Sequence, residues 1–260
     1  MSALRWLAIA AVLYGCATTQ QPDFSVDTGT TTAAESGDAR HRARVHTELA
    51  ALYYSRRNMA VALEELRIAQ AADPSYAPAY GIYGLVYMEL REIQLAEQSF
   101  QRGLRIAPQD PDLNHNYGWF LCQNGREQDS IKYFVAAVRN PLYARPWRSN
   151  SAAGTCSARI GQSQEAEAFF ERALVDEPNE LGALLQLGEI RYRQARLEDA
   201  RRLVTRFNTL VEPTAESLWL ALRIERRLGN RGAEQSFAAQ LRKNYATSRE
   251  YQMLQRGEDE

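Results

Sequence analysis

Small residues recur along this chain at an almost constant spacing, and this regularity restricts its fold more than any other feature. A glycine or alanine returns at steps of 34, 34, 36 and 34 residues: Ala50, Gly84, Gly118, Gly154 and Gly188. We call these the marker positions. Another small residue follows each marker by 12 positions: Ala62, Ala96, Ser130, Ala166 and Ala200. A period of roughly 20–50 residues is typical of solenoids, in which each unit buries its apolar face against its neighbours.

A bulky residue and a proline complete most of the repeating units. The bulky residues are Leu66, Phe100, Phe134, Phe170 and Val204. The prolines are Pro74, Pro108, Pro141, Pro178 and Pro213. Two helices that cross closely need small residues at the crossing, and proline follows the end of a helix because it cannot continue one. The pattern therefore predicts a helix–turn–helix in every unit.

This pattern resembles the tetratricopeptide repeat, a 34-residue helix–turn–helix with the same order of small, bulky and proline positions. The resemblance implies an all-α superhelical solenoid over residues 41–256, with about six units and a C-terminal capping helix. The expected units are 43–76, 77–110, 111–146, 147–180, 181–214 and 215–246, and the expected cap is 247–256. The helices of the sixth unit are expected to pack differently, because Leu222 and Glu234 replace its small residues.

The N-terminus reads as an export signal. Arg5 precedes an apolar run over residues 6–14, which is too short to span a bilayer and typical of a signal peptide. Leu13-Tyr14-Gly15-Cys16 resembles the lipobox of bacterial lipoproteins. That resemblance implies a signal peptide over residues 1–15 and a lipid on Cys16. The following Ala17, in place of aspartate, favours the outer membrane. The alternative is an ordinary signal peptide with a chance cysteine.

Residues 16–40 are expected to carry the lipidated cysteine and a flexible tether. The stretch is rich in Thr, Ser, Gly and Asp and has a single aromatic residue, Phe24. Such a composition cannot bury enough apolar surface to order itself. The tether would hold a folded domain near the membrane.

Charge and motifs argue against catalysis and against nucleic-acid binding. The chain has 31 Lys and Arg residues against 32 Asp and Glu, a net charge of −1, whereas nucleic-acid binders are usually basic. It contains no His-Glu-x-x-His, Walker-type, Gly-x-Ser-x-Gly or Cys-x-x-Cys motif. His41, His46 and His115 show no metal-ligand spacing. We therefore expect no enzyme, metal, cofactor or small-molecule substrate, and a monomer.

Two cysteines remain once Cys16 is assigned to lipid. Cys122 follows its marker by 4 residues and Cys156 follows its own by 2. If the first helices of adjacent units lie side by side, this difference is an axial offset of about 3 Å. Because exported proteins meet an oxidising compartment, we expect a Cys122–Cys156 disulfide. The alternative is two buried free thiols.

The first helices of such a stack line a concave face, which is the expected partner-binding surface. Positions three before, one after and four after each marker face it. The candidates in the N-terminal half are apolar or aromatic: Tyr54, Leu85, Met88, His115 and Trp119. Exposed side chains of this kind in a concavity are typical of peptide-binding hot spots. The alternative is that Met88 and Trp119 are covered by their neighbours.

A lipobox followed by six such repeats resembles the PilF/PilW family of type IV pilus biogenesis lipoproteins. The most specific stretches are Asn116-Tyr117-Gly118-Trp119-Phe120-Leu121-Cys122 and residues 218–254. The resemblance implies a non-enzymatic pilotin, lipid-anchored on the periplasmic face of the outer membrane. Its expected partner is the secretin ring of the pilus machine, whose localisation and assembly it would promote. The alternative is a general periplasmic adaptor lipoprotein of another envelope complex, such as a regulator of peptidoglycan synthesis.

Overall fold

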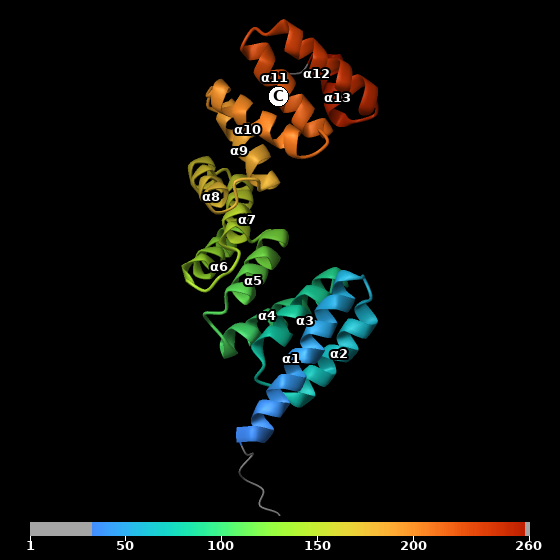
Figure 1. Ribbon diagram of the computed structural model, residues 1–260, viewed down its shortest axis with the longest axis vertical. Coiled ribbons are helices and arrows are strands. Elements are labelled where there is room, and N and C mark those ends of the chain that lie inside the picture. The colour runs from blue at the N-terminus through green and yellow to red at the C-terminus, as the bar shows by residue number, and fades with distance from the viewer. Residues whose placement is uncertain (1–32, 258–260) are drawn as a thin grey trace, which may run out of the picture.

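The computed structural model describes residues 33–257, which form thirteen α-helices and no strand (Figure 1). The expected all-α solenoid of tetratricopeptide repeats with a C-terminal capping helix is confirmed. The helices are α1 (Ala33–Ser55), α2 (Met59–Ala72), α3 (Ala77–Glu89), α4 (Ile93–Ile106), α5 (Pro111–Gln123), α6 (Glu127–Arg139), α7 (Pro146–Arg159), α8 (Ser163–Asp176), α9 (Leu181–Arg193), α10 (Leu197–Leu210), α11 (Ala215–Arg227), α12 (Arg231–Asn244) and α13 (Arg249–Arg256).

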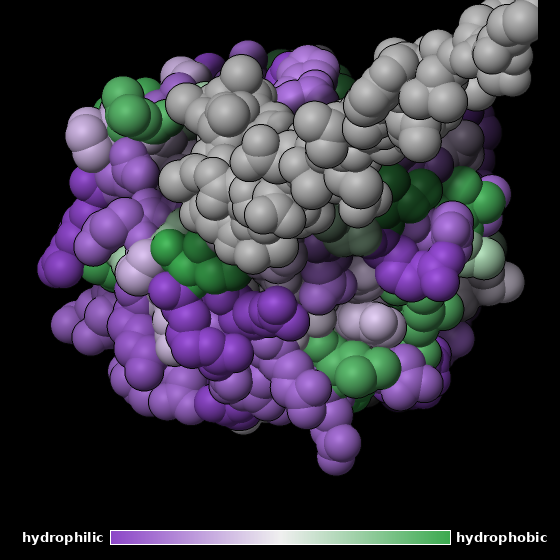
Figure 2. All heavy atoms as spheres, turned by 90° about the horizontal axis from the view of Figure 1, so that it is seen from below, coloured by the Kyte–Doolittle hydropathy of each residue, from purple (hydrophilic) through white to green (hydrophobic). Residues whose placement is uncertain are grey.

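Helix pairs stack along the long axis, with α1 and α2 near one end and α11–α13 at the other (Figure 1). Each odd-numbered helix from α1 to α11 contacts its even-numbered partner, and the next odd-numbered helix. The core lies between the helices. Seen from the α1–α2 end, the part of the exterior not covered in grey is mostly hydrophilic, with small separate hydrophobic patches (Figure 2).

The marker glycines are the points at which the two helices of a unit meet. A Cβ atom added to Gly84 would lie 2.4 Å from the Phe100 ring, and one on Gly154 would lie 2.7 Å from the Phe170 ring. Both phenylalanines are fully buried. Because real Cβ atoms do not approach other atoms so closely, only glycine allows this crossing without a shift of the aromatic ring.

One turn position has the same backbone conformation in all six units. The residue seven positions after the marker site has a positive φ in each: Arg57, Arg91, Gly125, Gly161, Ala195 and Gly229. Glycine adopts this left-handed conformation freely, whereas other residues pay about 1 kcal/mol. The packing of the two helices therefore imposes the turn even where the local residue opposes it.

The first helix begins earlier than expected. Residues 33–40 of the predicted tether are helical, so that part of the prediction was wrong. Arg40 explains part of the extension, because its guanidinium lies 5.7 Å from the centre of the Tyr76 ring and 4.0 Å from the Asp73 carboxylate. These contacts hold the start of α1 against the loop before α3. The signal peptide, Cys16 and residues 17–32 lie outside the described residues.

The longer step of the repeat lies in one loop. Residues 140–145 link α6 to α7, whereas residues 107–110 and 177–180 make the equivalent links in the neighbouring units. Among the helices of residues 33–257, none combines the length and apolar character needed to cross a membrane.

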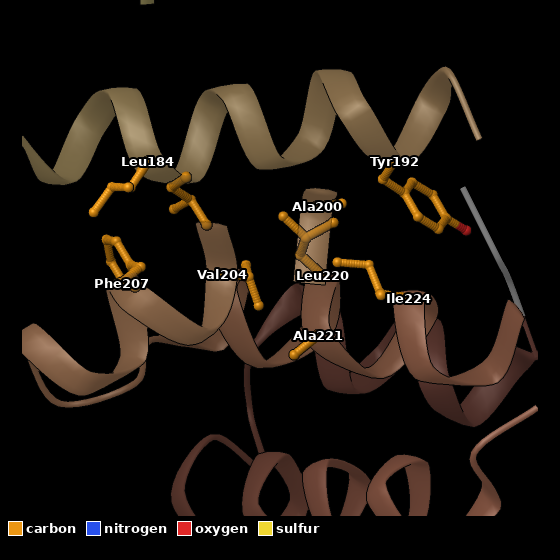
Figure 3. Close-up of a cluster of buried hydrophobic side chains, with 9 residues drawn as sticks. Leu184, Tyr192, Ala200, Val204, Phe207, Leu220, Ala221 and Ile224 are labelled. Carbon is orange, nitrogen blue, oxygen red and sulfur yellow. The ribbon is translucent and has the colours of Figure 1, made fainter. Parts of the chain in front are cut away.

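The sixth unit replaces small residues with a leucine and an ion pair. Leu222 is fully buried in a cluster with Trp219, Leu241 and Met253 of the cap α13. Glu234 accepts a hydrogen bond of 2.7 Å from Arg226 Nε, so its carboxylate is satisfied. A second cluster joins this unit to the fifth by side chains of α9, α10 and α11 that point toward one another (Figure 3): Leu184, Tyr192, Val204, Phe207, Leu220 and Ile224.

Candidate partner-binding groove

A groove of about 440 Å³ runs across the first helices of units one to four. We call it the first-helix groove. It is lined by Tyr54 of α1, Leu85 of α3, three residues of α5 (His115, Asn116 and Trp119), five of α7 (Trp147, Arg148, Ser151, Ala152 and Thr155) and Glu180. Four consecutive units therefore contribute side chains to one surface.

Four of the five predicted groove residues meet in this groove, and one does not. Tyr54, Leu85, His115 and Trp119 line it, although they come from three different helices. Met88 is absent from the lining. Its half-buried side chain packs against the buried cluster around Phe100, as the alternative for this residue had it. Leu85 packs against the same cluster and also lines the groove.

His115 belongs to the floor of the groove rather than to its exposed surface. Only 7% of the residue is exposed, and Nδ1 lies 2.9 Å from Ser149 Oγ. The Ser149 hydroxyl donates its hydrogen to Tyr143 Oη. The Ser149 oxygen can then only accept from His115, which places the hydrogen of the neutral imidazole on Nδ1. Desolvation lowers the pKa of His115 from 6.5 to about 4, and repulsion by Arg148 and Arg145 adds to the shift. The imidazole is thus a neutral structural group.

A disulfide lies next to the groove. Cys122 of α5 and Cys156 of α7 are bonded, with their Cα atoms 6.0 Å apart. The bridge sits in a buried cluster with Phe134 and Phe169, and the half-buried Trp119 packs against that cluster. The bond therefore fixes the two helices that carry most of the groove lining.

The sequence analysis missed part of the contribution of α7. Ser151 and Thr155 line the groove at two of the predicted offsets, three before and one after Gly154. Trp147 and Arg148 precede the marker Gly154 by seven and six residues, outside the three offsets that we considered. Position seven before the marker lies one helical turn from position three before it, on the same helix face. Extending the pattern by one turn would have found Trp147.

The groove carries a positive charge without a partner. Arg148 is half-buried, and its side chain has no ion pair or hydrogen bond to any residue between 33 and 257. Glu180 lines the same groove but forms no ion pair with Arg148, and its carboxylate accepts from the backbone N–H groups of Gly182 and Ala183 and from Ser151 Oγ.

The chemistry of the first-helix face changes in the last two units. A further hollow of about 660 Å³ shares Thr155 with the first-helix groove and is lined by Glu189 and Arg193 of α9. Glu189 and Arg223 occupy the position one after the marker site that Leu85 and Trp119 fill in earlier units. Arg223 Nη2 donates to Glu189 at 2.6 Å, and its guanidinium lies 4.6 Å from the centre of the Tyr192 ring. The two charges thus pair within the protein, although Arg223 Nε has no hydrogen-bond partner among the described residues.

Within the described part of the chain, no cluster of three or more His, Cys, Asp or Glu side chains is arranged to hold a metal ion. The groove does contain a serine hydroxyl that donates to a carboxylate, Ser151 to Glu180, and His115 on its floor contacts the hydroxyl of the buried Ser149. The aromatic and amide groups of the groove suit the binding of another polypeptide.

Comparisons with known proteins agree with this architecture. A family profile of the tetratricopeptide repeat matches residues 47–111. Together with the six stacked helix pairs and the groove across the first helices, it defines the chain as a repeat protein of the protein-interaction class.

Two relatives narrow this class to a family. The chain is 27% identical over 248 residues to the type IV pilus assembly protein PilF of Pseudomonas aeruginosa, covering 95% of each. The crystal structure of PilW, described as a widely conserved type IV pilus biogenesis factor, is 32% identical with a TM-score of 0.72, covering 82% of this chain and 98% of PilW. A structure of Pseudomonas aeruginosa PilF has a TM-score of 0.80 at 25% identity, covering 85% of this chain and 100% of PilF. The chain belongs to the PilF/PilW family.

Proposed function

We propose that this chain is a non-enzymatic outer-membrane lipoprotein that binds secretin subunits through the first-helix groove. It promotes their localisation and assembly into rings for type IV pilus biogenesis. The observation that carries the proposal is the groove itself, in which Tyr54, Leu85, Trp119 and Trp147 from four units face one surface. Membership of the PilF/PilW family supports the connection to the pilus.

Side chains of this kind supply binding energy when they leave water. Trp and Tyr dominate interface hot spots, because they bury large areas at a small cost in conformational entropy. A secretin segment, helical or extended, would cover them until the ring closes. Acyl chains on Cys16 would hold the solenoid on the periplasmic face of the outer membrane, since several chains anchor stably.

The experiment is a secretin immunoblot on separated membranes, without boiling, in a strain deleted for this gene. The deletion strain is complemented with wild type, with Leu85→Asp and with Leu90→Asp. Leu85 lines the groove, whereas Leu90 lies at the end of α3, is 43% exposed and does not line it. The two substitutions introduce the same carboxylate, one at a half-buried side chain inside the groove and one at an exposed side chain outside it.

We expect heat-resistant secretin multimers to disappear in the deletion strain and with Leu85→Asp, and to return with wild type and Leu90→Asp. Both variants must melt within a few degrees of wild type. Normal multimers in the outer membrane of the deletion strain would contradict the secretin assignment. Normal multimers with Leu85→Asp alone would contradict the groove assignment. Substitution of Cys16 by Ser tests the lipid anchor by the same membrane separation.

A further inference from the structure

Arg148 is unusual among the arginines of this protein. Between residues 33 and 257, five arginines are buried or half-buried. Four of them contact a glutamate: Arg191, Arg201, Arg223 and Arg226. Arg148 contacts none in that part of the chain. Removing a charge partly from water without a partner costs free energy, so the four pairs follow the usual rule and Arg148 departs from it.

The surroundings of Arg148 add to its positive potential. The exposed Arg145 stands at the start of the same helix, and both guanidiniums depress the pKa of the neighbouring His115. The groove carboxylate, Glu180, forms no ion pair with either of them and accepts instead from the N-terminus of α9 and from Ser151. The groove thus contains a cation without an ion-pair partner among the described residues, and the indole rings of Trp119 and Trp147 line the same groove.

A second group in the groove also lacks a partner. The half-buried side-chain amide of Asn116 makes no hydrogen bond within residues 33–257. An amide offers one acceptor and two donor hydrogens, which matches the N–H and C=O of a peptide group. A polypeptide lying in the groove would satisfy it.

We propose that the first-helix groove recognises an acidic–apolar peptide segment, in which an aromatic or aliphatic side chain packs on Trp119 and Trp147 and an Asp or Glu carboxylate pairs with Arg148. This inference rests on the proposed function insofar as it takes the same groove as the partner-binding surface. It adds the chemistry of the partner. Bidentate pairing of a guanidinium with a carboxylate gives both direction and strength in a partly desolvated site.

The test uses synthetic 12-residue peptides with acetylated and amidated ends, so that only side chains carry charge. Each peptide has one Trp or Leu anchor and, at scanned positions, Asp, Asn or Lys. Binding to the purified full-length chain is measured by fluorescence anisotropy. We expect the best Asp peptide to bind about tenfold more tightly than its Asn counterpart, with the Lys counterpart weakest.

Charge reversal supplies the decisive comparison. Arg148→Glu should reverse the order, so that the Lys peptide binds best, and Arg148→Gln should abolish the preference. Arg139→Glu is the matched control, because Arg139 is exposed at the end of α6 and does not line the groove. It should leave the order of wild type unchanged. Binding of the Lys peptide to Arg148→Glu also shows that this variant is folded.

Equal binding of Asp, Asn and Lys peptides to wild type would overturn the proposal, and so would the absence of binding by every peptide. A preference for Asp that survives Arg148→Glu would overturn the assignment to Arg148. These outcomes are independent of the membrane experiment. Peptide specificity without any effect of the deletion on secretin would refute the proposed partner and leave the recognition chemistry standing.

Discussion

The two halves of this solenoid use equivalent positions in opposite ways. The residue one after each marker site changes from small or apolar to charged along the chain: Ala51, Leu85, Trp119, Thr155, Glu189 and Arg223. Leu85 and Trp119 line an open groove, whereas Glu189 and Arg223 pair with each other at 2.6 Å. The same fold position therefore lines a groove in one half and forms an internal ion pair in the other.

This difference distinguishes the positions that the repeat fold requires to be small or bulky from the positions that are free to vary. The crossing of the two helices needs a small residue against a bulky one, and Gly84 with Phe100 supplies it. The faces that do not take part in the crossing are free to vary. In the C-terminal half they are filled by internal ion pairs such as Arg201 with Glu225. In unit four, at the edge of the first-helix groove, Arg148 is left unpaired within the described residues.

The largest effect on stability is expected from removal of the disulfide between α5 and α7, the two helices that carry most of the groove lining. A double Cys122→Ala, Cys156→Ala substitution should lower the free energy of unfolding in urea by roughly 3–4 kcal/mol, because the bridge closes a long loop. Hydrogen exchange should accelerate in α5 and α7 more than in α11–α13. Reducing agent should cause the same loss in wild type and none in the variant. An equal acceleration of hydrogen exchange in α5, α7 and α11–α13 would contradict a local role of the disulfide.

Low pH should lower the free energy of unfolding through His115, which forms part of the floor of the groove. The pKa of this imidazole is about 4 in the folded state, against 6.5 in the unfolded chain. The unfolded state therefore binds more protons between these values, and stability is full above pH 6.5 and falls as the pH drops toward 4. Between pH 7 and pH 4.5 wild type should lose about 2 kcal/mol more than His115→Gln. Parallel unfolding curves at both pH values measure this difference. Identical losses would show that His115 is not desolvated.

Marker glycines in the two halves should respond to alanine with opposite signs. A Cβ on Gly84 would lie 2.4 Å from the Phe100 ring, whereas one on Gly188 would meet nothing closer than 3.5 Å. Gly84→Ala should cost about 1–2 kcal/mol, since overpacking exceeds the gain in helix propensity. Gly188→Ala should stabilise by up to about 1 kcal/mol. Thermal and urea unfolding measure both, and a stabilising Gly84→Ala would contradict the close crossing.

The smallest effect on stability is expected from replacing the Glu189–Arg223 ion pair of the last two units. Replacing Glu189 by Gln and Arg223 by Met together should change stability by less than about 1 kcal/mol, because a buried ion pair and a well-packed apolar side chain are often equivalent. Glu189→Gln alone should cost more, because Arg223 is only 8% exposed and would lose its carboxylate. A double variant less stable than this single variant would show that the ion pair itself stabilises the last two units.

Much of the fold follows from the sequence because its determinants are local and repeated. The spacing of Gly118 and Phe134, and of their equivalents, predicts helix pairs whose crossing the structure shows. The spacing of Cys122 and Cys156 from their markers likewise predicts which cysteines come together, since equivalent points on stacked helices lie side by side. The turns follow too, although Arg57 and Ala195 adopt a conformation that favours glycine.

The amino-acid sequence by itself determined the helix pairs, their order and the face along which the first helices line up. The tertiary structure decided which side chains on that face line the groove. Met88 packs against the cluster around Phe100 without lining the groove, His115 is hydrogen-bonded to Ser149, and Trp147 enters from α7. The repeat period of the sequence reveals only the features that all units have in common. Whether a side chain keeps a free surface depends on neighbours from other units, because burial and charge pairing are set by contacts far apart in the chain.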